Sequence, residues 1–237
     1  MKKALLLSLL FLVSQICFSQ SLVGAWEWLE TDEEGKKIKG VVTFSESYQA
    51  AAWFDAETGV FVKTNGGTWK LDGNTMTEVA EFNTAEPDKV GETASFEIEW
   101  DGSDKMRRVG MDAWATRVDD GTPGDLNGAW LMSGRKRNGE IQQRDTDRPR
   151  KTMKILSGTR FQWIAYNTET KQFMGTGGGT YTTIDGKYTE NIEFFSRDDS
   201  RVGASLEFNY ELKDGKWHHS GKSSKGEPLY EVWSMRD

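Results

Sequence analysis

Residues 206–212 read Leu-Glu-Phe-Asn-Tyr-Glu-Leu, and this strict alternation of apolar and polar side chains decides the fold class. In an extended strand, the apolar side chains would share one face and the polar side chains the other. Residues 94–100, Ala-Ser-Phe-Glu-Ile-Glu-Trp, repeat the pattern. A period of two predicts strands with one face on a core and the other in water.

Tight turns separate such strands along the chain. Four of them contain the same pair of residues: Asp72-Gly73, Asp101-Gly102, Asp185-Gly186 and Asp214-Gly215. Asp-Gly pairs are typical of the hairpins that join consecutive antiparallel strands. No segment shows a helical period, so we expect an all-β protein.

The sequence also repeats itself. Residues 22–26, Leu-Val-Gly-Ala-Trp, recur as residues 126–130, Leu-Asn-Gly-Ala-Trp. Later segments recur in the same order: 66–69 as 178–181, 77–82 as 189–194, 90–91 as 202–203, and Trp114 with Arg117 as Trp233 with Arg236. Because closing a sheet removes its edges, we predict two tandem antiparallel up-and-down β-barrels, with a β-sandwich as the alternative.

Residues 1–19 have the composition of a secretory signal peptide. Lys2 and Lys3 precede an apolar run over residues 4–13, and small residues stand near the expected cleavage site. We expect the first barrel over residues 20–118, a linker of turn-forming residues over 119–125 and the second barrel over 126–237. The exported protein would be periplasmic or extracellular, with no transmembrane segment after cleavage.

The composition excludes several classes of function. The chain of 237 residues has a net charge of −7, two His, and a single Cys that falls in the predicted signal peptide. The mature chain would therefore hold no disulfide or thiolate, and two His are too few for an ordinary metal site. Nucleic acid is not an expected partner, because phosphate binding needs concentrated Lys and Arg. We predict no metal and no cofactor.

The Gly-Ala-Trp motif at residues 24–26 and again at residues 128–130 resembles the opening motif of lipocalins. In that family the Trp packs at the closed end of the barrel against an Arg of the last strand. The resemblance implies two structural barrel-closing pairs, Trp26 with Arg117 and Trp130 with Arg236.

The second copy is similar to bacterial exported lipocalin-like domains of unassigned function. Residues 188–194, 217–221 and 231–236 carry this likeness. The first copy departs from it at residues 106–110, where it lacks the His pair of the second copy. The resemblance therefore directs attention to the second barrel.

Glu190 is the most informative single residue. By strand parity it shares a face with Tyr188, Ile192 and Phe194, so a carboxylate stands in an otherwise apolar, inward row. The first copy has Glu78 at the matching position. An unpaired buried carboxylate costs several kcal/mol, so Glu190 needs a protein partner, a raised pKa or a ligand. A structural pair with Arg, Lys or Tyr, a ligand anchor and a catalytic acid or base are the three interpretations.

Aromatic residues of the second copy could line an apolar pocket around Glu190. The predicted ligand-binding residues are Trp163, Tyr181, Tyr188, Glu190, Phe208, Tyr210 and His219. A filled core is the alternative, because small barrels pack such side chains in their interiors.

Our leading hypothesis is a non-enzymatic exported protein that binds a small, partly apolar ligand in the second barrel. One alternative is an enzyme that uses Glu190, Tyr188 and His219 for proton transfer or hydrolysis. The other is an envelope module with filled barrels that recognises a protein or a glycan.

A basic cluster flanks the predicted first hairpin of the second copy. Its members are Arg135, Lys136, Arg137, Arg144, Arg148, Arg150 and Lys151. We interpret it as a solvated face, with an anionic ligand at the barrel mouth as the alternative.

Overall fold

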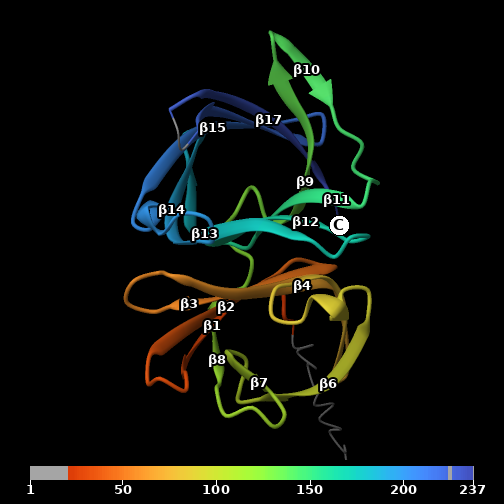
Figure 1. Cartoon of the computed structure of the whole chain (residues 1–237), viewed down its shortest axis with the longest axis vertical. Coiled ribbons are helices and arrows are strands. Elements are labelled where there is room, and N and C mark those ends of the chain that lie inside the picture. The colour runs from red at the N-terminus through yellow and green to blue at the C-terminus, as the bar shows by residue number, and fades with distance from the viewer. Residues whose placement is uncertain (1–20, 224–225, 237) are drawn as a thin grey trace, which may run out of the picture.

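The computed structural model describes residues 21–223 and 226–236, and the predicted signal peptide lies outside the described residues. Two closed antiparallel barrels of eight strands each follow one another along the chain (Figure 1). The prediction of an all-β protein with tandem barrels is therefore confirmed. Among the described residues, no helix has the length and apolar character needed to cross a membrane.

The first barrel is an uninterrupted meander in which each strand pairs with the next. Pairing of the first strand with the eighth closes the sheet. A short 3-10 helix, η1 (Pro87–Lys89), lies between the fifth and sixth strands. The strands are β1 (Gly24–Thr31), β2 (Lys37–Phe44), β3 (Tyr48–Asp55), β4 (Phe61–Asp72), β5 (Thr75–Asn83), β6 (Thr93–Trp100), β7 (Lys105–Arg108) and β8 (Ala115–Asp119).

The second barrel repeats this meander with one extra strand. That strand, β10, pairs with β9 alone, and the resulting hairpin projects from the barrel (Figure 1). Pairing of β9 with β17 closes the sheet. The elements are β9 (Gly128–Arg137), β10 (Glu140–Gln143), β11 (Arg150–Leu156), β12 (Arg160–Asn167), β13 (Phe173–Ile184), β14 (Lys187–Phe195), the 3-10 helix η2 (Asp199–Arg201), β15 (Ser205–Lys213), β16 (Lys216–Lys222) and β17 (Pro228–Met235).

The repeated Gly-Ala-Trp motif starts each barrel in the same conformation. Gly24 and Gly128 have φ angles of 118° and 121°, which side-chain-bearing residues rarely adopt. A Cβ atom at Gly24 would also overlap the backbone carbonyl of Asp119. Trp26 and Trp130 are buried, and each donates its indole N–H at 2.9 Å to the carbonyl four residues earlier. The motif therefore sets where the first strand enters each barrel.

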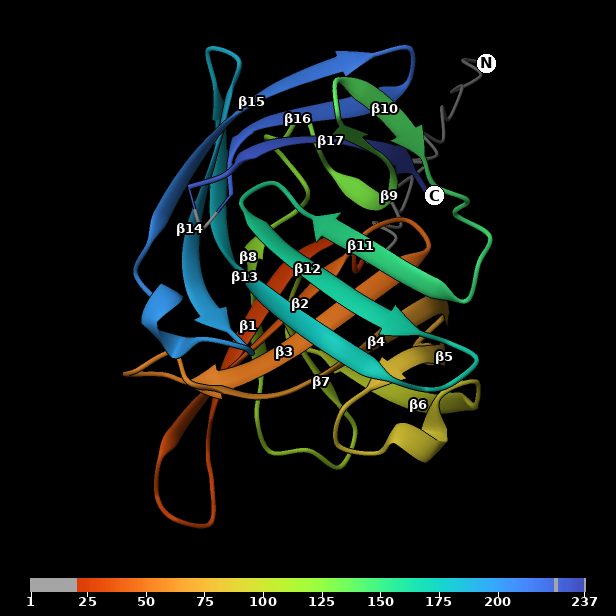
Figure 2. The same cartoon turned by 45° about the horizontal axis from the view of Figure 1, so that its top comes forward.

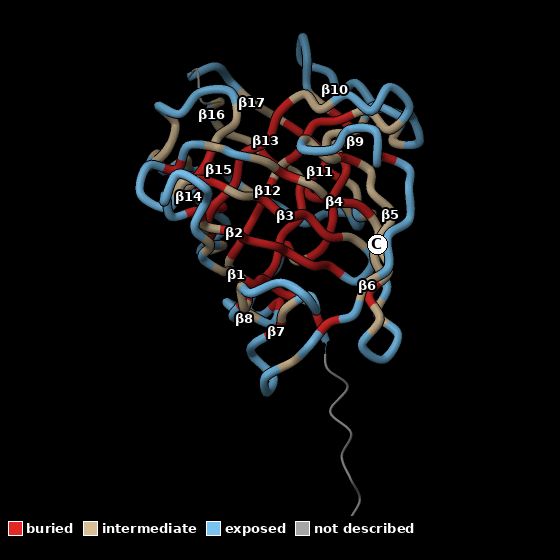
Figure 3. Tube along the Cα trace, turned by 60° about the horizontal axis from the view of Figure 1, so that its bottom comes forward, coloured by how far each residue is buried: buried red, intermediate tan, exposed pale blue. Residues whose placement is uncertain are grey.

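The outer faces of the barrels pack against each other. Strands β2 and β3 run across β11 and β12 (Figure 2), and buried segments of both barrels meet there (Figure 3). Phe54 stacks on Phe194 with 4.9 Å between ring centres, and Phe82 lies 5.0 Å from Tyr166. Apolar clusters that contain residues of both barrels make this contact a second core outside the barrel interiors.

A β-bulge changes the predicted facing of one strand. The register of β14 against β13 shifts at Glu193, and this extra residue inverts the alternation. Phe194 therefore faces the first barrel, while Phe195 packs on the interior of the second. The prediction that Phe194 shares the inward face of Tyr188 is wrong for this reason. Strand β5 has the equivalent bulge, and Phe82 likewise lies between the barrels.

The strand register allows one of the two predicted barrel-closing pairs to form and prevents the other. In the first barrel Arg117 pairs with Trp26 and places its guanidinium 4.0 Å over the indole. In the second barrel Met235 takes the place opposite Trp130. Because a shift of one residue moves a side chain to the other face, Arg236 lies on the outside. The prediction that Arg236 closes the second barrel is therefore wrong.

Arg236 instead joins the two barrels. Its guanidinium donates to both carboxylate oxygens of Glu81 in the first barrel, at 2.8 and 2.6 Å. It also lies 4.0 Å over the ring of Tyr48. The Tyr166 hydroxyl donates to the same carboxylate at 2.5 Å. A bidentate Arg–carboxylate pair of this kind adds geometric specificity to the apolar contact.

Candidate functional site

The predicted ligand-binding residues of the second barrel come together in a packed interior. Tyr188 is fully buried, and its ring centre lies 5.1 Å from Trp217 and 5.7 Å from His219. The others lie in, or partly buried beside, the same apolar cluster: Tyr181, Phe208, Trp163 and Tyr210. The structure therefore brings the predicted residues together as side chains that pack on one another inside the second barrel.

Glu190 has a protein partner that sequence reasoning missed. The Lys154 ammonium on β11 donates to its carboxylate at 2.6 Å, and both side chains are buried. The same ammonium lies 4.9, 5.0 and 5.4 Å from the rings of Tyr188, Trp217 and Trp233. The ion pair and the ring faces together satisfy both charges. Of the three interpretations of Glu190, the structural pair therefore accounts for its burial.

The sequence contains a clue to the pairing of Lys154 with Glu190, but the apolar neighbours of Lys154 obscure it. Lys154 stands between Met153 and Ile155, which both face the first barrel and are buried. A strand that is apolar on its outer face hides the normal alternation, so its single inward Lys resembles a surface residue. A lone Lys within such an apolar run, together with an inward Glu in the same repeat, was the available clue.

His219 lies close to a second interior carboxylate. Its Nδ1 atom is 3.5 Å from Glu231. Burial, and after it the charge of Lys154, lower the pKa of His219. Burial alone would raise the pKa of Glu231, but His219 and Lys154 lower it. Across the part of the chain that the structure describes, no group of three or more His, Cys, Asp or Glu is arranged to hold a metal ion.

Strand registers identify the equivalent residues of the two barrels. Val42 pairs with Trp26, and Lys154 pairs with Trp130, so Val42 takes the place of Lys154. Glu78 pairs with Trp69 two residues after the bulge glycine of β4, as Glu190 pairs with Tyr181 in β13. The first barrel therefore keeps the interior Glu and lacks the Lys that neutralises it in the second.

The first barrel holds a cavity of about 340 Å³ beside this Glu. Glu78 and Gln49 line it together with Arg108, Asn65 and Asn83. Residues of the loop between β5 and β6, which contains η1, complete its wall. The cavity therefore lies at the end of the barrel where β5 ends and β6 begins.

Smaller side chains explain why this barrel is hollow where the second is filled. The registers place Gln49, Ala80, Asn83 and Ala94 where the second barrel has Phe161, Ile192, Phe195 and Leu206. All four residues of the first barrel line the cavity, and all four counterparts belong to the second core or pack against it. The first copy therefore carries less apolar side-chain volume around Glu78 than the second copy carries around Glu190.

The surroundings of Glu78 raise the pKa of its carboxyl group. Gln49 donates its side-chain amide to the carboxylate at 3.2 Å. Burial raises the pKa of Glu78 to about 7, although the charge of Arg108 acts in the opposite direction. The Arg108 guanidinium itself lies 4.4 Å over the ring of Phe96. A carboxyl group with such a pKa, in a cavity, is a candidate binding or proton-transfer group.

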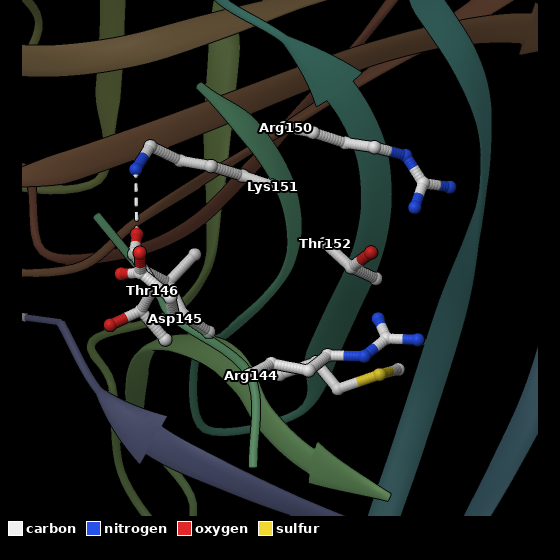
Figure 4. A pocket seen from close by; sticks show the side chains of 8 residues that line it. Arg144, Asp145, Thr146, Arg150, Lys151 and Thr152 are labelled. Atoms are coloured by element: carbon white, nitrogen blue, oxygen red, sulfur yellow. Dashed lines mark hydrogen bonds between the residues drawn. The ribbon is translucent and has the colours of Figure 1, made fainter. Parts of the chain in front are cut away.

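The basic cluster of the second copy offers much less room. Arg144 and Arg150 project to the same side of Thr152, while Lys151 turns away to donate to the Thr146 carbonyl at 2.9 Å (Figure 4). The hollow between them measures about 30 Å³. That is space for a water molecule or two, not for an organic ligand. The structure therefore favours the first-barrel cavity as the candidate site.

Comparison with known proteins covers the second barrel alone. Residues 125–235 match the model of a family described as "Domain of unknown function (DUF4488)". No curated protein matches the chain. The first barrel, with its cavity, lies outside the matched region.

Proposed function

We propose that this chain is an exported, lipocalin-like binding protein whose first barrel holds a small ligand in the cavity beside Glu78. The observation that carries the proposal is a cavity of about 340 Å³ at positions where the second copy packs apolar bulk. Pockets for small molecules typically measure about 300–1,000 Å³. Most of the lining side chains are polar or charged, and Ala80, Ala94 and Phe96 supply its apolar part. The ligand assigned to the second barrel by sequence thus moves to the first.

The second barrel serves in this proposal as a rigid support. Arg160 extends from it to Glu27 of β1 at 2.9 Å, and Arg236 holds Glu81 of β5. Strands β3 and β5 carry Gln49 and Glu78 on the inside while their outer faces pack on the second barrel. A wall that is held from outside loses little freedom on binding, which favours affinity.

Export and lipocalin likeness belong to the same proposal. The composition of residues 1–19 supports secretion to the periplasm or the medium. The repeated Gly-Ala-Trp start and the stacking of Arg117 on Trp26 support the lipocalin-like assignment.

Native mass spectrometry of the full chain, purified from its own host, tests the proposal. The matched variant Ala80→Ile/Ala94→Leu fills the cavity with the residues that the second copy carries at the same positions. We expect the wild type to retain a small molecule and the filled variant to lose it. The control Leu206→Ala, which trims the second barrel, should retain it.

Two results would overturn the proposal. One is a ligand that survives the filling of the first barrel, and the other is loss of the ligand in Leu206→Ala alone. If the wild type carries no ligand, binding of a probe library to the wild type and not to the filled variant decides the matter. Circular dichroism shows that the variants are folded.

A further inference from the structure

We propose that the ligand of the first barrel carries an organic ammonium group, which pairs with Glu78 as Lys154 pairs with Glu190 in the second barrel. The inference rests on the proposed function, because it names the chemistry of the ligand in the same cavity. It follows from comparing the two copies of one fold within one chain.

The second barrel displays the complete arrangement. Its interior Glu190 receives an ammonium at 2.6 Å, and aromatic rings surround that ammonium within about 5 Å. Lys154 supplies the charged group on a tether from β11. The fold can therefore hold an alkylammonium group against this carboxylate, and in the second barrel the Lys154 side chain supplies that group.

The first barrel has the same carboxylate without the tethered charge. Val42 stands at the position of Lys154. The cation whose charge acts on Glu78 is Arg108, and its guanidinium lies 4.4 Å over the Phe96 ring. Gln49 contributes one hydrogen bond at 3.2 Å, which leaves most of the acceptor capacity of the carboxylate unused.

The other charged side chains of the cavity balance one another, so Glu78 carries its excess negative charge. Besides Glu78, the carboxylates of Glu86 and Glu92 line it, against the charges of Lys89 and Arg108. Lys89 already pairs with Glu92 at 3.2 Å. The guanidinium of Arg108 stacks on the ring of Phe96. A carboxylate ligand would add a further negative charge, whereas an ammonium offers three donors to a site rich in acceptors.

Phe96 contributes an aromatic ring to the lining of the cavity. It corresponds to Phe208 in the register of the second barrel. The Arg108 guanidinium covers one face of this ring at 4.4 Å, so the Glu78 carboxylate is the main partner that the cavity offers an ammonium. A compact alkyl or cycloalkyl amine fits a space of about 340 Å³.

A matched set of probes tests this chemistry. Titration calorimetry of the full chain at pH 8 with cyclohexylamine, cyclohexanol and cyclohexanecarboxylate varies the charge at nearly constant shape. We expect the amine to bind at least about tenfold more tightly than the alcohol, and the carboxylate more weakly than both. Glu78→Gln, which keeps the shape of the side chain, should abolish the preference for the amine.

The substitution Val42→Lys introduces an ammonium group that competes with the amine ligand for Glu78. It places in the first barrel the Lys that the second barrel carries, and we expect it to remove amine binding. Val42→Met, of similar length without charge, should retain it. Where Val42→Lys fails to fold, Glu78→Gln still decides the question.

The outcomes separate this inference from the proposed function. Equal binding of amine and alcohol, lost when Ala80→Ile/Ala94→Leu fills the cavity, would overturn the ammonium and leave the binding barrel standing. Retention of the amine preference in Glu78→Gln would overturn the inference as well. Failure of the wild type to bind any probe, with no copurifying ligand, would overturn both.

Discussion

Replacing Lys154 by Met tests whether the ion pair in the second barrel satisfies Glu190. The exchange keeps the length of the side chain and removes the ammonium, so Glu190 stays buried without its partner. The side chains of the pair are 6% and 7% exposed and 2.6 Å apart, so solvent can replace little of the lost interaction. Removing one partner of a buried pair costs about 3–5 kcal/mol. For a chain of this size, about 2–4 °C of melting temperature accompanies each kcal/mol.

Urea unfolding followed by tryptophan fluorescence measures this cost, because Trp217 and Trp233 lie beside the Lys154 ammonium. The double variant Lys154→Met/Glu190→Gln should recover most of the stability, since it removes both charges. Lys187→Met is the control: its ion pair with Glu207 is exposed, and we expect a loss below about 1 kcal/mol. A loss of less than about 1 kcal/mol for Lys154→Met would refute the argument and return Glu190 to the candidate ligand anchors.

Further predictions concern Glu78, Arg236 and Gly24. The raised pKa of Glu78 means that the folded state binds its proton more tightly than the unfolded state, so the contribution of Glu78 to stability should fall as the pH rises from about 4.5 to about 7. Chemical unfolding across that range should show that the stability of the wild type falls relative to that of Glu78→Gln as the pH rises, with Arg108, Glu86, Lys89 and Glu92 around the cavity unchanged. Arg236→Met should destabilise the protein by about 2–4 kcal/mol, because it leaves Glu81 without its cationic partner between the barrels; an effect no larger than that of an exposed Lys would contradict this. Gly24→Ala should lower the melting temperature by several degrees, through its φ of 118° and the overlap with Asp119, and a neutral result would show that β1 can shift.

Alternation and repetition were sufficient to predict the architecture. The period of two in residues 94–100 and 206–212 depends on local backbone geometry, so it survives in any context that buries one face. The order of the shared segments then required two copies of one sheet, and the glycines of the repeated motif mark the same strand entry in both. These features are short-range, which is why no tertiary information was needed.

To predict the site, one would have needed to know which side chains meet across the interior of each barrel. Lys154 and Glu190 lie on strands that are not neighbours in the sheet, so no pattern along either strand reveals their contact. The prediction of an interior Glu was sound in the second barrel, where Glu190 is buried. The partner, and the absence of that partner from the first barrel, came from the three-dimensional registers.

The sequence by itself determined that this protein is a tandem of antiparallel barrels with an interior carboxylate in each copy, because strand alternation and repeat order are encoded locally. Tertiary structure decided what each copy does with that carboxylate. A single bulge at Glu193 and a one-residue offset turned Phe194 and Arg236 from the interior to the contact between barrels. Side-chain volumes summed around the closed sheet then left the first barrel hollow beside Glu78 and the second filled around Glu190. Packing of this kind depends on all the strands at once, so it exists only in the folded protein.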